Sequence, residues 1–302
     1  MRLTETESEA IEANLFPLAR PLVGEWKGFP WRRRRGGDVT ASGVHCSQAL
    51  TIDVFETVKR LRSCNVIVRK WVAALFPRLE SGRIWGITLE REVERELLRE
   101  VESRTHLDVL LTSSRSLVSV QCVFTEPADA GCRLVRPLAE GPHEGKVQCS
   151  GEYRMQQSPI NGALHRCAYS GKGTRYWQVI PQVLGYDMAQ DIVPCPFAAG
   201  GHAWMRHLVA AHEVGRTYPG GPLQPAFLLV HAEGAFPAAR QLQGTSVQDF
   251  LATANRHAVP MAAVSFQELI TLARSVAVPE DDAVLADLAA WVQRKVRLAS
   301  LA

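Results

Sequence analysis

Two neighbouring segments contain residues whose types and spacing could hydrolyse a phosphodiester bond with a divalent metal. Asp108 lies in residues 106–111, which alternate towards a strand, and residues 117–124 form a second predicted strand after a polar turn. Side chains two positions apart on a strand share a face, so Gln121 and Val123 would point the same way. Metal-dependent nucleases need acidic side chains that converge on one or two cations, and a group that handles the attacking water. Asp108 is the clear acid of this predicted hairpin.

The stretch from Asp108 to Pro127 resembles the PD-(D/E)xK nuclease superfamily, in particular a group of predicted bacterial restriction endonucleases. In that group the second strand would carry Glu-x-Lys, then Phe or Tyr, then Thr-Glu-Pro. Further similar segments are His-Cys-Ser-Gln-Ala-Leu at 45–50, Arg-Tyr-Trp at 175–177 and Cys-Pro-Phe at 195–197. The resemblance therefore covers roughly residues 40–215, and its hairpin is the part that bears on chemistry.

The chain departs from this pattern at its two chemical positions. Gln121 stands where the family has its acid, and Val123 stands where the family has its lysine. The resemblance implies that Asp108 and Gln121 would bind Mg²⁺, but an amide oxygen brings no charge and would weaken the site. A valine can neither donate to a phosphate nor take a proton from water. In a regular strand the Glu126 side chain would point to the face opposite to that of Gln121 and Val123. Glu126 could therefore replace the missing acid only where the strand bulges or ends.

Other residues could also complete such a site, and a non-catalytic interpretation stays open beside it. Glu25 or Glu56 could add an acid, and Lys59 or Lys172 could supply the lysine, although no spacing rule selects any of them. In the non-catalytic interpretation Asp108 is a carboxylate satisfied by a nearby arginine. Gln121 is then a core amide hydrogen-bonded to backbone.

A run of four arginines could contact a phosphate backbone. The run consists of Arg32, Arg33, Arg34 and Arg35, with Trp31 and Lys27 beside it. Arginines bind phosphates, and Trp31 could stack on a base. The alternative is a solvated loop that self-repulsion holds open. Because no base-reading motif accompanies the run, the sequence predicts no target specificity.

A zinc site is the second functional class that the residues allow. Soft ligands could come from Cys132, His143, Cys149, His165, Cys167 and Cys195. No paired Cys-x₂-Cys occurs and the spacings match no known zinc knuckle, so individually buried cysteines and surface histidines are favoured. The histidines at 202, 207 and 212 are five positions apart and do not share a helix face, which excludes the zinc-protease pattern.

The composition limits the remaining possibilities. The chain has 302 residues, 46% of them hydrophobic, and a formal net charge of +3, which is too small to indicate a nucleic-acid partner by itself. No stretch reaches the length of apolar residues that a membrane helix needs, so no membrane partner is expected. The acidic start of the chain lacks the layout of a secretory signal. Seven irregularly spaced cysteines argue against a disulfide framework and favour a cytoplasmic location.

Hydrophobic periodicity predicts an α/β protein with a restriction-endonuclease-like mixed sheet flanked by helices and a helical C-terminal portion. The predicted strands are 84–89, 106–111, 117–124, 149–155, 165–169, 225–231 and 259–264. The predicted helices are 3–16, 47–61, 174–184, 203–214, 246–257, 265–275 and 280–298. We expect residues 1–240 to form the core with N-terminal helices and insertions. Residues 241–302 would pack on the same domain.

These observations predict a protein that acts on DNA. If it is an enzyme, it hydrolyses phosphodiesters with Mg²⁺, using Asp108 as a ligand. The alternative is a catalytically silent nuclease fold that serves as a DNA-binding or scaffolding subunit of a defence system. A homodimer or a defence-system partner protein is compatible with both.

Overall fold

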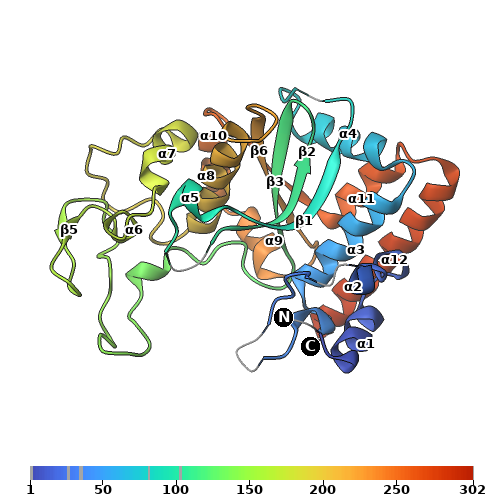
Figure 1. Cartoon of the computed structure of the whole chain (residues 1–302), viewed down its shortest axis with the longest axis horizontal. Helices are drawn as coiled ribbons and strands as arrows, with labels where there is room; N and C mark the ends of the chain where they lie inside the picture. Colours follow the sequence, from blue (N-terminus) through green and yellow to red (C-terminus); the bar gives the residue numbers. More distant parts are fainter. Residues whose placement is uncertain (1–2, 26–27, 34–36, 81, 102–103, 302) are drawn as a thin grey trace.

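A five-stranded mixed sheet forms the centre of the molecule in the computed structural model (Figure 1), which describes residues 3–25, 28–33, 37–80, 82–101 and 104–301. The strand order is β1-β2-β3-β6-β7. The bounds are β1 Gly86–Glu92, β2 His106–Thr112, β3 Ser116–Val123, β6 Gln224–His231 and β7 Met261–Ser265. The strands β1, β2 and β3 pair in antiparallel fashion, whereas β6 and β7 run parallel to β3. The predicted mixed α/β sheet is therefore confirmed.

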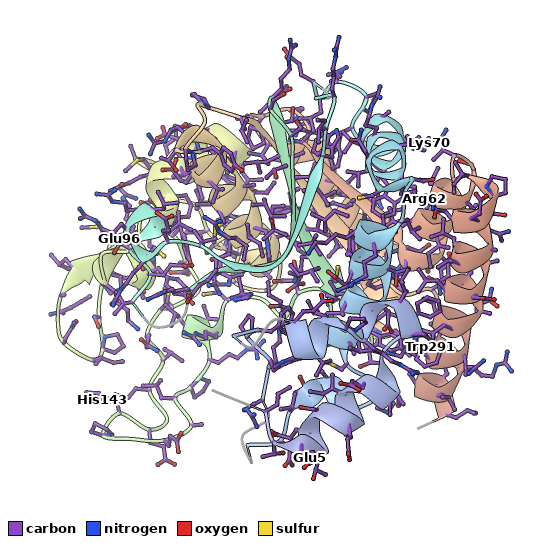
Figure 2. All side chains as sticks on the ribbon, turned by 45° about the vertical axis from the view of Figure 1, so that its right-hand side comes forward. Glu5, Arg62, Lys70, Glu96, His143 and Trp291 are labelled. Carbon is purple, nitrogen blue, oxygen red and sulfur yellow. The ribbon has the colours of Figure 1, made fainter. Side chains whose placement is uncertain are left out.

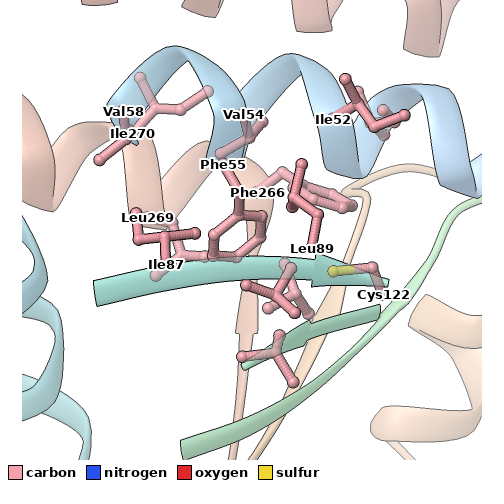
Figure 3. Packing of buried hydrophobic residues seen from close by; sticks show 14 of the residues in the cluster. Ile52, Val54, Phe55, Val58, Ile87, Leu89, Cys122, Phe266, Leu269 and Ile270 are labelled. Carbon is pink, nitrogen blue, oxygen red and sulfur yellow. The ribbon is translucent and has the colours of Figure 1, made fainter. Parts of the chain in front are cut away.

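One face of the sheet packs against helices from both ends of the chain. These are α3 (Ser47–Arg60), α4 (Cys64–Leu75), α11 (Phe266–Arg274) and α12 (Pro279–Leu301). Figure 3 shows Phe55 of α3 lying over Ile87 and Leu89 of β1, close to Leu269 of α11. The apolar residues of α3 recur at helical spacing, which is why its sequence prediction agrees with the structure to within one residue.

The opposite face packs against α7 (Tyr176–Leu184), α8 (His202–Arg216), α9 (Pro237–Leu242) and α10 (Thr245–Ala254), which form a second hydrophobic cluster with it. Parallel neighbours need a crossover connection, and α8 supplies it between β3 and β6. The short helix α5 (Arg95–Leu98) leads from β1 to β2 on this side.

A loop-rich lobe, residues 128–201, extends from this second face (Figure 1, left). Its regular elements are η3 (Arg133–Val135), β4 (Gln156–Gln157), β5 (Leu164–His165), α6 (Ala168–Gly171) and the longer α7. The predicted strand at 149–155 is wrong, because Tyr153 forms only an isolated bridge with Ile192. The predicted strand at 165–169 is also wrong beyond its first residue, since α6 follows. An alternation of apolar and polar residues indicates which side chains would be buried, but a strand also needs a neighbouring strand to pair with.

The N-terminal segment wraps around the α3 side. It contains α1 (Glu5–Asn14), η1 (Pro17–Ala19), α2 (Leu22–Glu25) and η2 (Thr40–Ser42). Thr4 and Glu7 form the capping box that their spacing predicts at the start of α1. The helical C-terminal portion is confirmed as well, because α12 runs for 23 residues beside α11. Among the helices in the described ranges, none has the length and apolarity required to cross a bilayer.

Candidate functional site

Asp108 lies where the regular pairing of two strands is interrupted. Pairs 89–109 and 91–107 join β1 to β2, and Glu90 and Asp108 face each other between these pairs. Glu90 has a φ of 50°, a left-handed conformation that a glutamate adopts only under constraint. Leu107 and Val109 pack into different hydrophobic clusters, so the side-chain alternation of β2 changes at Asp108. This irregularity turns two acidic side chains into the protein, as bulges near functional sites commonly do.

Arg32 forms ion pairs with both acids. Its Nη2 forms an ion pair with Oδ1 of Asp108 and lies 3.5 Å from Oε1 of Glu90. Asp108 also accepts a hydrogen bond from the backbone N–H of Cys122, at 2.7 Å. The Asp108 and Glu90 side chains are 8% and 2% exposed, whereas that of Arg32 is 41% exposed. The guanidinium therefore closes the solvent side of a buried carboxylate pair.

The neighbouring elements fix Arg32 in this place. Its backbone N–H donates to Oε1 of Gln48 on α3, at 3.0 Å, and its carbonyl accepts from the backbone N–H of Thr40. On the other side of the pair, Nδ1 of His106 lies 2.9 Å from Oε2 of Glu90 but outside hydrogen-bonding geometry. The site thus combines the N-terminal segment, α3 and the first two strands.

Burial and neighbouring charges shift the pKa values of Arg32 and Asp108. Burial alone would lower the pKa of Arg32, but the charges of Asp108 and Glu90 raise it above its usual value. Burial raises the pKa of Asp108, while Arg32 opposes this shift, and the Glu90 charge adds to it. The two acids raise the pKa of the cation that they share, whereas for Asp108 burial outweighs the effect of that cation.

The other predicted catalytic residues do not join Asp108. Gln121 and Val123 lie on the α8 side of β3, where Val123 is a buried core residue. Gln121 donates a weak hydrogen bond of 3.5 Å to the carbonyl of Ala128. Glu126 binds the Ser47 hydroxyl at the start of α3 and accepts from its neighbour Phe124. Asp108 is paired with an arginine and Gln121 is hydrogen-bonded to backbone. These are the contacts that the non-catalytic interpretation of the sequence predicts.

The alternative acids and lysines lie elsewhere. Arg60 binds Glu56, at 2.8 Å, and also Glu25, at the far end of α3. Lys59 contacts the same Glu56 carboxylate, 3.3 Å away. Lys172 belongs to the loop-rich lobe and donates to Gln148. Glu56 lies nine positions beyond Ser47 on α3, about 13 Å along the helix axis, and the partners of these four groups are residues other than Asp108.

Mg²⁺ does not fit this site as it is built. Within the described ranges, no three His, Cys, Asp or Glu side chains are placed to hold a metal ion together. The charge that a cation would contribute between Asp108 and Glu90 already comes from the Arg32 guanidinium. A hard cation requires several oxygen ligands, which the buried pair alone does not provide.

The arginine run is only partly available for DNA. Arg32 is engaged as described, and Arg33 pairs with Glu7 of α1 and donates to the carbonyl of Gly37. Arg34 and Arg35 lie outside the described residues. The two arginines that the structure describes therefore bind groups of their own chain, which the sequence did not predict for Arg33.

Four of the six possible zinc ligands come together in the loop-rich lobe. A single cavity of about 20 Å³ is lined by Cys132, Cys149, Cys167 and Cys195, along with aromatic residues. His143 and His165 are not among its lining residues. The sequence analysis favoured individually buried cysteines, because their irregular spacing did not indicate that they converge.

Replacing Arg32 with alanine tests the ion pair. The variant leaves Asp108 and Glu90 without a cation, so we expect the free energy of unfolding to fall by about 1–3 kcal/mol. This is below the cost of breaking a fully buried pair, because solvent screens the half-exposed guanidinium. Urea unfolding at pH 7 measures the change. Arg33→Ala is the matched control and should cost less than Arg32→Ala, because its ion pair with Glu7 is screened by solvent. Equal losses in both variants would contradict a special role for Arg32.

The site consists of two buried carboxylates and one guanidinium that meet from three separate parts of the chain. The contacts of Arg32, Glu90 and Asp108 are the observations from which a function can be inferred. Comparisons of the chain with protein-family models, with curated proteins and with solved structures found no match.

Proposed function

We propose that this chain is a nuclease-like fold that binds DNA without cutting it. The observation that carries the proposal is the ion pair of Arg32 with Asp108, the residue that the PD-(D/E)xK resemblance makes a metal ligand. The antiparallel β2–β3 hairpin supports the nuclease-like part, since it holds Asp108 and Gln121 on adjacent strands as the resemblance implies. The absence of a lysine at Val123 supports the silent part. We place this role in the cytoplasm, where seven free cysteines stay reduced.

A second feature, which we call the α4 basic surface, supports binding to a polyanion. It consists of Arg62, Arg69, Lys70, Arg78 and Arg83, which are all exposed. Within the described ranges none of them has an acidic partner. Figure 2 shows Arg62 and Lys70 on the outer side of the helical layer. Unpaired arginines and lysines on one surface are the usual means of phosphate-backbone contact.

The α4 basic surface lies away from Asp108. Arg83 precedes Gly86, which pairs with Thr112 at one end of the hairpin, and Asp108 is four residues further along β2. Four residues of strand span about 14 Å, so Arg83 leads into the end of β1 that is remote from Asp108. DNA bound at Arg83 would therefore not contact the Asp108 carboxylate, which fits a binding protein better than a nuclease.

We expect no cleavage of plasmid or linear DNA by the unmodified chain with Mg²⁺ or Mn²⁺. The assay compares it with Asp108→Ala and with Gln121→Glu/Val123→Lys by gel analysis of nicked and linear products. Product that forms with the unmodified chain and disappears in Asp108→Ala would overturn the silent assignment. Product from the double variant alone would support a nuclease-derived fold, because it would restore the family's acid and lysine.

DNA binding itself should occur without metal and weaken with salt. In fluorescence anisotropy, Arg69→Glu/Lys70→Glu should reduce the slope of log K against log salt by about 1.8, because two phosphate contacts are lost. The matched control is Arg294→Glu/Arg297→Glu, which reverses two exposed charges on α12. Equal effects of both pairs would show that net charge, and not the α4 basic surface, determines binding.

A further inference from the structure

Four cysteines that are far apart in the sequence line one small cavity of the loop-rich lobe. They are Cys132, Cys149, Cys167 and Cys195, and neighbours are 17 to 28 positions apart in the chain. All are free thiols in this structure. The other three cysteines lie elsewhere, on or beside α3, at the start of α4 and in β3. The convergence therefore concerns these four alone.

Backbone hydrogen bonds join three of the four segments that carry the cysteines. The bonds are Cys149 N–H to Leu134 O at 3.0 Å, Cys132 N–H to Phe197 O at 2.9 Å and Cys195 N–H to Gly151 O at 2.9 Å. The fourth segment is joined by a side chain, since Nε2 of Gln156 donates to the carbonyl of Arg166, at 3.3 Å, and to Sγ of Cys149, at 3.8 Å. The cavity thus lies between connected segments of the chain, and these segments carry its four lining cysteines.

Gly131 shows how closely two of these segments approach. Its φ is 73°, and a Cβ at this position would lie 2.7 Å from the carbonyl oxygen of Ala198. Only glycine fits such a contact, which keeps Cys132 next to the segment that follows Cys195. The lobe is therefore built to hold these two cysteines near each other.

Backbone N–H groups lie around three of the thiols. The N–H groups of Leu134 and Val135 lie beside the Cys132 thiol, and that of Phe197 lies beside Cys195. Those of Tyr169 and Ser170 lie beside Cys167. Amide groups two and three residues after a cysteine stabilise a thiolate, and metal-bound thiolates need such partners.

We propose that Cys132, Cys149, Cys167 and Cys195 together bind one zinc ion. Four thiolates in a closed protein site form the tetrahedral sulfur set that Zn²⁺ prefers. The cavity of about 20 Å³ admits one atom-sized guest, since a single water needs at least about 10–15 Å³. Binding releases the thiol protons to solvent and changes no oxidation state.

The ion would draw the four side chains inward. In the described part of the chain, the thiols do not yet stand in coordination geometry. A Zn–S bond of about 2.3 Å in a tetrahedron places the sulfurs about 3.8 Å apart, so the side chains must turn towards a common centre. The aromatic wall, formed by Tyr153 stacked on Trp177 with ring centroids 3.4 Å apart, shields that centre from water.

A site with four protein ligands leaves no open position for chemistry, so its role is structural. The lobe adds no strand to the central sheet, and its regular elements before α7 are four residues or shorter. Small loop-rich units commonly need a metal or disulfides because they bury little apolar surface. The zinc ion would hold this lobe against α7 and α8.

Metal analysis of the purified full chain tests the site. We expect about one zinc ion per chain, and each of four variants, Cys132→Ser, Cys149→Ser, Cys167→Ser and Cys195→Ser, should lose at least about 90% of it. The matched control Cys64→Ser, a half-buried cysteine of α4, should keep its zinc. Unchanged zinc content in the four variants, or a chain that neither contains nor takes up zinc, would overturn the proposal. Iron with inorganic sulfide would also overturn it.

A second measurement covers variants that fail to fold. In the unmodified chain, a thiol reagent should react with Cys132, Cys149, Cys167 and Cys195 only after a chelator has removed the metal. Cys122, which is buried in β3, should stay protected throughout. Substitution with Co²⁺ should give the visible absorption of tetrahedral thiolate coordination. Thiol reactivity that a chelator does not change, together with no cobalt spectrum, would show that the four cysteines bind no metal.

Discussion

Replacing Asp53 with alanine should lower the free energy of unfolding by about 3–5 kcal/mol. Asp53 lies on α3 and is fully buried, and its Oδ2 accepts from Nζ of Lys295 on α12 at 2.7 Å. Its other oxygen, Oδ1, accepts from the backbone N–H of Phe16 at 2.6 Å, and Nε1 of Trp291 donates to Oδ2. One carboxylate thus connects the N-terminal segment, the core helix and the last helix.

The cost arises mainly from the group that remains. In Asp53→Ala the ammonium of Lys295, with only 5% of its side chain exposed, loses its counter-charge inside the protein. Burying an unpaired charge is expensive, and two further donors lose their acceptor. Removing both charges avoids this penalty, so Asp53→Leu/Lys295→Met should recover most of the loss.

Chemical denaturation at pH 7 measures these differences. Asp282→Ala is the matched control, because it removes an exposed ion pair with Arg274 and should cost much less than Asp53→Ala. If Asp53→Ala were no less stable than Asp282→Ala, the buried pair would not hold the two ends of the chain together. If the double variant were as unstable as Asp53→Ala, the loss would reflect the donors of Phe16 and Trp291 left without an acceptor, or the packing of α3, and not the unpaired lysine.

Acidification from pH 7 to pH 5 should destabilise the protein by about 2 kcal/mol for each of two buried histidines of α8. Burial lowers the pKa of His202 to about 4 and that of His207 to about 3. His207 stacks on Phe227 of β6, with ring centroids 5.1 Å apart, and His202 stacks on Tyr169. Neither environment accommodates an imidazolium.

The direction follows from proton binding in the two states. Above pH 6.5 both states carry neutral histidines, and these residues add no pH dependence. Below it the unfolded chain binds protons that the folded chain rejects, so stability falls until the pH reaches the folded-state pKa of about 4 or 3. Between pH 6.5 and 5 this amounts to 1.5 pH units at about 1.4 kcal/mol each.

Urea unfolding at several pH values, with and without His207→Gln, isolates this effect. The variant should lose about 2 kcal/mol less than the unmodified chain between pH 7 and pH 5. His257→Gln, which changes an exposed histidine, is the control for general acid effects. Identical pH dependence in the unmodified chain and His207→Gln would contradict a neutral, buried His207.

Local sequence signals determined most of the elements. The helical spacing of apolar residues located α3, and the Thr4–Glu7 pair marked the start of α1. The alternation around Asp108 located the hairpin of β2 and β3. The sequence analysis missed α4, although Ile67, Val68, Trp71 and Val72 recur at helical spacing within it. These features depend on neighbours within a few residues, which is why the sequence alone carries them.

Only the tertiary structure decided what the candidate site contains. Asp108 was found from its strand, but its partner Arg32 lies 76 residues away, and nothing local connects the two. The sequence analysis did not select Glu90 as a site residue, because regular alternation places its side chain on the opposite face from Leu89. The break in pairing opposite Asp108 turns it inward. The four cysteines meet for the same reason, since packing of distant segments brings them to one cavity. A sequence records local preference along the chain, whereas charge neutralisation and ligand convergence depend on distances across it.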